Sequence, residues 1–359
     1  MKKYIPLFAK VSFLLFALSC VLYMVAIRWV TVADKVNSTV SVWVRYVLAN
    51  ATAWLPFSFF ELLVILSPVI LVLLIVTFLK RGKAVRQRVR SIVSLLAVIS
   101  LILTSYIYTL GIGYHTTPVS DRIGIEDRRD ISTEELYRTV LILVDEVNSL
   151  APVVDFSDGE TRMPYSVDEL SERLVSAYDT LLAEYPILTN YSSRVKPVYF
   201  STVMSDLGIT GIYSFFTGEA NINVEYPDYY VPFTAAHELA HQRGVCRENE
   251  ANFVAFLTTI SSDDEYVRYS GYLYTYEYLA SALYRADPEL YFAAREQLDE
   301  RARADMRAAS AVYNKHKDSI LGRINDRLND AYLKANGTDG VISYGYVTRL
   351  VVSYYSSKQ

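Results

Sequence analysis

Residues 233–257 read FTAAHELAHQRGVCRENEANFVAFL, and the fold of the C-terminal part of the chain is best predicted from this stretch. Small and apolar residues precede His237 at a spacing that suits a helix packed against a core. Gly244 follows three residues after His241, where a left-handed cap would end that helix. The residues from 247 to 257 are again typical of a helix. The stretch therefore predicts two helices joined by a tight turn.

The first of these helices carries the pattern His-Glu-x-x-His at residues 237–241. Positions i and i+4 share one face of a helix, so the imidazoles of His237 and His241 can reach the same metal ion. Glu238 lies beside the first histidine, where its carboxylate can act as the general base on a metal-activated water. Two ordinary histidines on a helix are the simpler interpretation, but the flanking residues favour a metal site.

The second helix offers two candidates for a third ligand, Glu248 and Glu250. A catalytic zinc commonly takes three protein ligands and leaves one position for water. Glu248 and Asn252 are four residues apart and share a face, so Glu248 could bind the metal while Asn252 hydrogen-bonds a histidine. Helix geometry therefore favours Glu248, and Glu250 stays open as the alternative ligand. Two histidines and a carboxylate predict one Zn²⁺ ion.

At this point the chain resembles known proteins. His-Glu-x-x-His followed by Glu248-Asn249-Glu250-Ala251-Asn252 resembles the gluzincin zinc metallopeptidases. With Thr217-Gly218-Glu219-Ala220-Asn221 upstream, the string is similar to an uncharacterised family of bacterial membrane-anchored zincin-like proteins, catalogued as domain of unknown function 3810. The resemblance covers nearly the whole chain and implies a zincin-like peptidase domain. Glu248 follows His241 more closely than in thermolysin-like enzymes, which leaves the choice between Glu248 and Glu250 open.

The first third of the chain predicts a membrane domain. Residues 11–27, 62–79 and 91–114 are three uncharged runs, each close to the length of about 20 residues that crosses a hydrocarbon core. We expect transmembrane helices at about 11–30, 58–79 and 91–113, within a domain spanning residues 1–114. A cleaved signal peptide at the first run is the alternative, but no small-x-small cleavage site follows it.

The basic residues predict the orientation of these helices. Lys2, Lys3 and Lys10 precede the first run, and six Lys or Arg residues fall between positions 80 and 90. The positive-inside rule places both segments in the cytoplasm. The loop of about residues 31–60 and everything after residue 114 then lie outside. The sequence thus predicts a multi-pass protein of the bacterial cell membrane, in contact with the lipid bilayer and with an extracytoplasmic C-terminal domain.

Composition excludes two other classes of protein. The net charge of −4 provides no basic surface for nucleic acid. The two cysteines, Cys20 in a membrane run and Cys246 beside the metal motif, cannot form a disulfide framework. Cys246 is predicted to be a small packing residue rather than a metal ligand.

Residues 115–359 are enough for one sizeable domain. Ser132 with Glu135 and Ser166 with Glu169 predict capping boxes at the starts of two helices. Residues 211–224 alternate and predict paired strands. Within them, residues 218–224 are either the sheet edge that holds an extended substrate or an ordinary core strand. The predicted fold class is membrane-anchored α+β: three N-terminal transmembrane helices, then a mainly helical zincin-like domain with a small sheet.

The predicted function is a membrane-anchored zinc metallopeptidase that hydrolyses extracytoplasmic peptides or proteins. Zinc would lower the pKa of its water, Glu238 would accept the proton, and a tyrosine from residues 269–278 would donate to the oxyanion. The alternative is a sensor or scaffold of the cell envelope that keeps the zincin fold and its zinc but cleaves nothing. The other two histidines, His115 and His316, are predicted to face solvent and not to bind metal.

Overall fold

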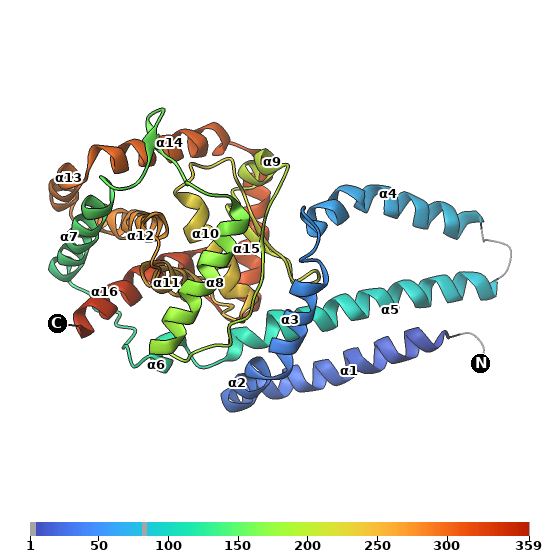
Figure 1. The fold of residues 1–359 in the computed structure, drawn as a ribbon. Helices are drawn as coiled ribbons and strands as arrows, with labels where there is room; N and C mark the ends of the chain where they lie inside the picture. The colour runs from blue at the N-terminus through green and yellow to red at the C-terminus, as the bar shows by residue number, and fades with distance from the viewer. Residues whose placement is uncertain (1–4, 81–84, 359) are drawn as a thin grey trace. The chain divides into compact units, whose positions relative to one another are not determined.

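The computed structural model describes residues 5–80 and 85–358 (Figure 1). Their contacts divide the chain into two compact units. Unit 1 holds the N-terminal part up to Thr116 together with the loop Ser214–Glu219, and unit 2 holds Thr117–Tyr213 and Ala220–Gln359. The boundary falls two residues beyond the predicted position 114. The loop Ser214–Glu219 falls within the predicted C-terminal domain by sequence but belongs to unit 1.

Unit 1 is built from helices, and three segments within it are long and apolar enough to cross a membrane. These segments are Leu7–Arg28, Phe59–Val76 and Gln87–His115, and they overlap the three predicted spans. The chain therefore has three candidate membrane helices by length and composition. The elements are α1 (Leu7–Arg28), α2 (Val30–Ser38), α3 (Val40–Ala51), α4 (Phe59–Lys80), α5 (Val85–Thr109) and the 3₁₀ helix η1 (Gly111–His115).

The segment of about residues 31–60, the predicted outer loop between the first two spans, is largely helical and is formed by α2 and α3. They are held together by a buried arginine: Arg45 of α3 donates to the side-chain and main-chain oxygens of Asn37, each at 2.8 Å. It also donates to the carbonyl of Tyr108, at the end of α5, at 3.3 Å. Because a buried guanidinium needs acceptors, these contacts fix both helices against α5.

The loop Ser214–Glu219 is bound within unit 1 through its main chain and its last side chain. The carboxylate of Glu219 accepts from the amides of Phe59 and Phe60, at 3.0 and 2.6 Å, and so caps the N-terminus of α4. Ser105 of α5 donates to the carbonyl of Phe215 at 2.6 Å. Gly218, with φ +74°, passes so close to α3 that a Cβ would lie 2.6 Å from the amide of Ala49. Both the positive φ and the close contact with α3 therefore require glycine at position 218.

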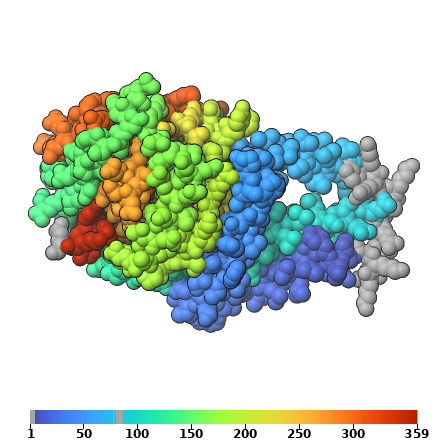
Figure 2. Space-filling view, viewed as in Figure 1, coloured from blue at the N-terminus to red at the C-terminus, as the bar shows by residue number. Residues whose placement is uncertain are grey.

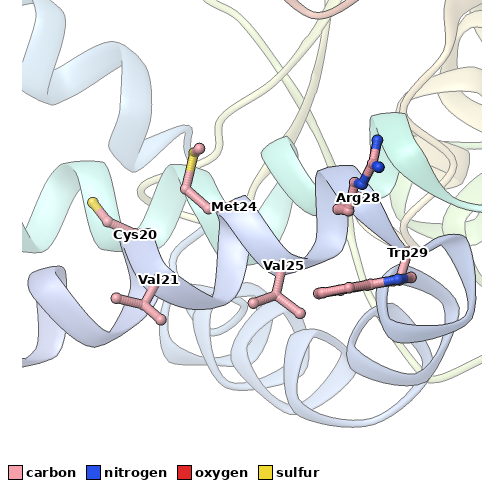
Figure 3. A pocket seen from close by; sticks show the side chains of 6 residues that line it. All are labelled: Cys20, Val21, Met24, Val25, Arg28 and Trp29. Atoms are coloured by element: carbon pink, nitrogen blue, oxygen red, sulfur yellow. The ribbon is translucent and has the colours of Figure 1, made fainter.

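Along α1, one face forms a shallow apolar hollow that ends at Trp29 (Figure 3). Val21 and Met24 are largely exposed, as suits side chains that face lipid. Trp29 follows the last residue of α1, where interfacial aromatic residues are common. The hollow is lined by Cys20, Val21, Met24, Val25, Arg28 and Trp29.

Unit 2 is mainly helical and has two small sheets. Its helices are α6 (Val119–Arg122), α7 (Thr133–Leu150), α8 (Val167–Glu184), α9 (Ser201–Asp206), α10 (Tyr230–Gln242), α11 (Glu248–Ile260), α12 (Glu265–Ala286), α13 (Pro288–Gln297), α14 (Glu300–His316), α15 (Ile320–Ala335), the 3₁₀ helix η2 (Gly340–Tyr346) and α16 (Val347–Ser357). Its strands are β1 (Phe156–Ser157), β2 (Glu160–Thr161), β3 (Val195–Pro197), β4 (Gly211–Tyr213) and β5 (Ala220–Ile222).

One continuous apolar core lies among the helices of unit 2, and α10 and α11 are at its centre. Nearly every residue of α10 and α11 is buried. Phe253 of α11 and Leu273 of α12 are fully enclosed in this core, as is Leu143 of α7. Both predicted capping boxes are present, at Ser132 for α7 and at Ser166 for α8. The fold is thus a membrane-associated, mostly helical protein with small sheets.

The three-stranded sheet has the order β3-β5-β4. Strand β5 pairs in parallel with β3 and antiparallel with β4, with Ile212 opposite Asn221. The predicted paired strands within residues 211–224 are therefore present. Of the two alternatives for residues 218–224, the structure shows the core strand, because β5 is central in the sheet and has a neighbour on each side. The edge beside α10 is β4.

Candidate metal centre

The two histidines of the motif lie on one turn of α10. Their rings stand perpendicular, with centroids 4.6 Å apart. The helix ends at Gln242, and Gly244 takes φ +98°, so that the amide of Val245 reaches back to the carbonyl of Ala240 at 3.0 Å. This is the left-handed end predicted for Gly244, and it turns the chain sharply into α11.

The turn brings the first residue of α11 against both histidines. Oε2 of Glu248 lies 3.3 Å from Nε2 of His237 and 3.4 Å from Nε2 of His241. One ligand atom of each residue lies within 4.8 Å of the other two. The three side chains are almost completely shielded from solvent. Two imidazole nitrogens and one carboxylate oxygen therefore converge on one point.

These donors fit a zinc ion. Ligand atoms placed tetrahedrally about 2.0–2.1 Å from zinc lie about 3.3–3.4 Å apart, which matches both nitrogen–oxygen separations. Nδ1 of His241 lies 2.7 Å from the carbonyl of Val245, so this nitrogen carries a proton, and Nε2, which faces Glu248, is the nitrogen that a metal ion would bind. Nδ1 of His237 is buried and has no hydrogen-bond partner among the described residues.

Charge at the centre is set by burial and by the convergence of these groups. Burial alone would raise the pKa of Glu248, but the two histidines outweigh it and hold that pKa well below its usual range. Glu248 is therefore an anion at neutral pH. Burial raises the pKa of the Glu238 carboxyl to about 6, against the opposing effect of His237 and His241. A carboxyl with a pKa near neutrality can both accept and release a proton.

Glu238 lies between the metal motif and the edge strand β4. The main-chain amide of Tyr213 hydrogen-bonds its carboxylate. Gly211 lies so close that an added Cβ would stand 2.7 Å from Cγ2 of Thr234 and nearer still to the Glu238 carboxylate. A glycine in β4 is what lets the strand approach Glu238. Oε2 of Glu238 is buried without a hydrogen-bond partner among the described residues.

The two candidate carboxylates, Glu248 and Glu250, have different partners in the structure. Oε1 of Glu250 accepts from Arg247 at 2.8 Å and from the amide of Val119 at 3.3 Å, and it takes no part in the convergent cluster. Asn252 donates to the hydroxyl of Tyr278 at 3.3 Å. The expected hydrogen bond from Asn252 to a histidine is absent among the described residues, because Val245 takes that role for His241. Metal binding by Glu248 stays a prediction.

Two tyrosines stand near the centre, and only one was anticipated. Burial raises the pKa of Tyr278 and Tyr344, and the charge of Glu248 raises it further. The charge of Glu238 also reaches Tyr344. Tyr278 falls in the predicted range 269–278. Tyr344 comes from η2, and no motif connects it to the histidines. Tyr269 donates to Asp305 instead, at 2.8 Å.

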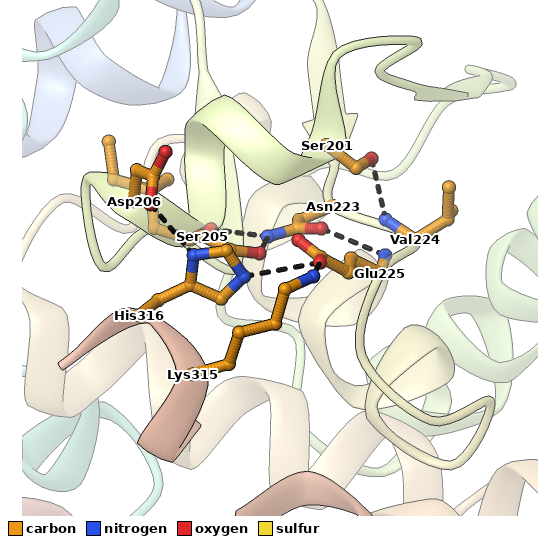
Figure 4. A network of polar contacts seen from close by, with 9 residues as sticks. Ser201, Ser205, Asp206, Asn223, Val224, Glu225, Lys315 and His316 are labelled. Atoms are coloured by element: carbon orange, nitrogen blue, oxygen red, sulfur yellow. Dashed lines mark hydrogen bonds and ion pairs between the residues drawn. The ribbon is translucent and has the colours of Figure 1, made fainter. Parts of the chain in front are cut away.

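A second cluster of histidine and carboxylates lies elsewhere in unit 2 (Figure 4). Nδ1 of His316 lies 2.8 Å from Asp206, and Nε2 lies 3.1 Å from Glu225. Lys315 also bonds Glu225, at 2.7 Å. The expectation that His316 faces solvent is wrong, since its side chain is only 6% exposed. His115, in unit 1, is partly buried and lies 3.3 Å from the hydroxyl of Tyr23.

Fold and cluster together define a mostly helical, membrane-associated protein with a potential metal site. The chain belongs to the family described as protein of unknown function DUF3810, whose sequence model matches residues 36–352. No curated protein and no solved structure matches the chain.

Proposed function

We propose that the protein is a membrane-anchored zinc metallopeptidase with a gluzincin-like, zincin-like domain, acting on extracytoplasmic peptides or proteins. One observation carries the proposal: His237, His241 and Glu248 converge, and the buried carboxyl of Glu238 stands next to them with its pKa near neutrality. A bound zinc ion would supply Lewis-acid chemistry, lowering the pKa of water and polarising a carbonyl. His237, His241 and Glu248 would hold one such ion.

Proton transfer and stabilisation of the oxyanion are assigned to residues of the chain. Glu238 accepts the proton of the attacking water and delivers it to the departing amine, which a carboxyl of pKa about 6 can do at neutral pH. Tyr278 and Tyr344 are the hydroxyl donors near the carboxylates, and either can hydrogen-bond the substrate oxygen on which charge develops.

The edge strand β4 suits an extended peptide substrate. The main-chain groups of Thr210 and Ser214, which flank the strand, bond toward residues 223 and 219. By the alternation of antiparallel pairing, the main-chain groups of Gly211 and Tyr213 point to the other side, where Glu238 lies. A peptide that pairs with this edge would have its backbone aligned beside the general base.

A sensor or scaffold that binds zinc without cleavage is the competing function. Binding alone needs the three ligands and no general base. The buried, unpartnered oxygen of Glu238 favours catalysis. Burying a carboxyl without a full set of partners destabilises the fold, and such groups are found mainly at functional sites.

The membrane location belongs to the same proposal. Three candidate spans and the basic residues near positions 2–10 and 80–90 support a multi-pass protein of the bacterial cell membrane with a cytoplasmic N-terminus. The metal centre would then act outside the cytoplasm. Protease treatment of intact cells should cleave the C-terminal part, and complete protection would contradict this orientation.

The test of activity uses the full chain, purified in detergent with zinc and incubated with a synthetic peptide library. Mass spectrometry should detect cleavage by the wild type. Glu238→Gln should keep its zinc and lose activity by about 10²-fold or more, while the control Glu250→Gln keeps both. Equal cleavage by Glu238→Gln would remove Glu238 from the mechanism. A zinc-loaded wild type that cleaves nothing would favour the sensor.

A further inference from the structure

Unit 1 contains a groove between α4 and α5, the helices of its second and third candidate spans. The groove has a volume of about 830 Å³, which is in the range of small-molecule sites in proteins. The space-filling view shows the hollow between these two helices (Figure 2). None of the residues in the Phe59–Val76 window of α4 is buried, so this helix leaves its apolar surface open along the groove.

The two walls of the groove differ in chemistry. Leu74 and Phe78 of α4 contribute an apolar wall. Arg90, Ser91 and Ser94 of α5 contribute polar groups, and Ser94 follows Arg90 by four residues and Ser91 by three, which places it on the same helical face as each of them. Polar side chains at membrane depth mark functional surfaces, because hydrocarbon cannot satisfy them. The groove therefore combines a surface for acyl chains with donors at one end.

The polar end of the groove carries Arg90, which lies in a basic stretch of the sequence. Arg90 belongs to the run KRGKAVRQRVR at residues 80–90, which holds six cations and no acid. Residues 81–84 of this run lie outside the described part of the chain. Basic clusters at the end of a membrane helix attract anionic lipid headgroups. The positive charge of Arg90 therefore favours an anionic ligand at this end of the groove.

A membrane span of a second copy that packed beside Arg90 would not supply that anion. In the sequence of the three candidate spans the only acidic residue is Glu61, near the opposite end of α4 from this basic run. A helix of another copy packed in the groove would leave Arg90 without a counter-charge. A phospholipid supplies both parts, with acyl chains for Leu74 and Phe78 and a phosphate for Arg90.

We propose that the groove between α4 and α5 binds an anionic phospholipid. The headgroup phosphate accepts hydrogen bonds from Arg90 and Ser91, and the acyl chains lie along the apolar wall of α4. The site is independent of the metal centre, so it stands whether or not the protein is a peptidase.

The test compares two arginines on one helix. Arg88 lies two residues before Arg90, carries the same charge, and does not line the groove. The full chain in detergent is titrated with phosphatidylglycerol or phosphatidylcholine, and bound lipid is counted by native mass spectrometry. We expect one phosphatidylglycerol per chain in the wild type. Arg90→Gln should weaken binding by about five- to tenfold, and Arg88→Gln by less than about twofold.

A second variant tests the groove itself. Ser94→Trp should fill the space without removing a charge and should displace the lipid. Equal losses in Arg88→Gln and Arg90→Gln would mean diffuse attraction and would overturn the site. Equal binding of phosphatidylcholine would do the same, as would a lipid-free dimer that Ser94→Trp dissociates. If a variant shows an altered thermal midpoint without lipid, its affinity is compared below that midpoint, where it is folded.

Discussion

The two histidine–carboxylate clusters of unit 2 use the same side-chain chemistry in opposite arrangements. At the first, two histidine nitrogens face one oxygen of Glu248, at 3.3 and 3.4 Å. At the second, the two nitrogens of one ring face different carboxylates, Asp206 and Glu225, on opposite sides (Figure 4). Lone pairs that converge can bind an ion, whereas a ring held between two anions is itself the cation. The geometry, and not the residue types, distinguishes the candidate metal centre from the second cluster, a clamp formed by Asp206, Glu225, Lys315 and His316.

The second cluster connects segments that are distant in sequence. His316 ends α14, Asp206 ends α9, and Glu225 follows β5. Burial would raise the pKa of Glu225, but Lys315, Ser205 and His316 lower it to about 2. Asn223, two residues before Glu225, binds the carbonyl of Ile209 at 3.0 Å, close to the start of β4. The clamp therefore supports the chain that leads into the edge strand beside Glu238.

The largest expected effect is a loss of zinc affinity, tested by removing one carboxylate from each cluster in turn. Glu248→Ala should lower zinc affinity by more than about 100-fold, because it removes a ligand of the convergent site. Glu225→Ala removes a carboxylate of the other cluster and should leave zinc affinity within a few-fold of the wild type. Competition with a chelating dye and elemental analysis measure both. If the two variants lose zinc equally, the contrast between the clusters is wrong.

A smaller effect is expected where β4 meets the metal motif. Gly211→Ala places a methyl group against Thr234 and the Glu238 carboxylate, and overpacking of this kind costs about 1–3 kcal/mol. We expect a lower thermal midpoint and reduced peptide cleavage. Gly345→Ala is the matched control, since its added Cβ meets nothing within 4 Å. A Gly211→Ala protein as stable as Gly345→Ala would mean that the strand is not held against Glu238.

Next in size is the loss of the clamp. His316→Gln keeps a polar side chain but leaves two carboxylates without their shared cation, at a cost of about 1–2 kcal/mol. The thermal midpoint should fall by a few degrees while zinc content stays unchanged. Lys317→Gln controls for charge on the same segment, because Lys317 is exposed and bonds the nearby Asn314. A loss of zinc in His316→Gln would contradict the separation of the clusters.

Local patterns predicted the parts of the fold that depend on neighbouring residues. The helix that carries His237 and His241, the left-handed end at Gly244 and the capping boxes at Ser132 and Ser166 each follow from a few adjacent residues. The three candidate spans follow from hydropathy over about 20 residues. Glu248 could be preferred to Glu250 because a helix fixes which positions share a face.

Contacts between distant parts of the chain could not be predicted in this way. His316 was expected to face solvent because its neighbours Lys315 and Lys317 are charged, yet its partners lie 110 and 91 residues away. Asn252 was expected to reach a histidine, but packing of α11 against α12 directs it to Tyr278. The residues around Tyr344 do not indicate that it lies near Glu238 and Glu248. Its position depends on where the tertiary fold places η2.

The smallest effect, and the one that most sharpens the contrast between the clusters, is a dependence of stability on pH. Hydrogen bonds to Asp206, and then to Glu225, raise the pKa of His316 in the folded protein. A histidine whose pKa is raised on folding stabilises the protein fully below its unfolded pKa of about 6.5, and this stabilisation is lost as pH rises through the folded pKa. The difference in thermal midpoint between the wild type and His316→Gln should therefore be largest near pH 6 and shrink toward pH 9. Measuring both proteins with saturating zinc keeps the metal centre in one state. A difference that stays constant across this range would mean that His316 contributes by packing alone, and the clamp would then not depend on charge.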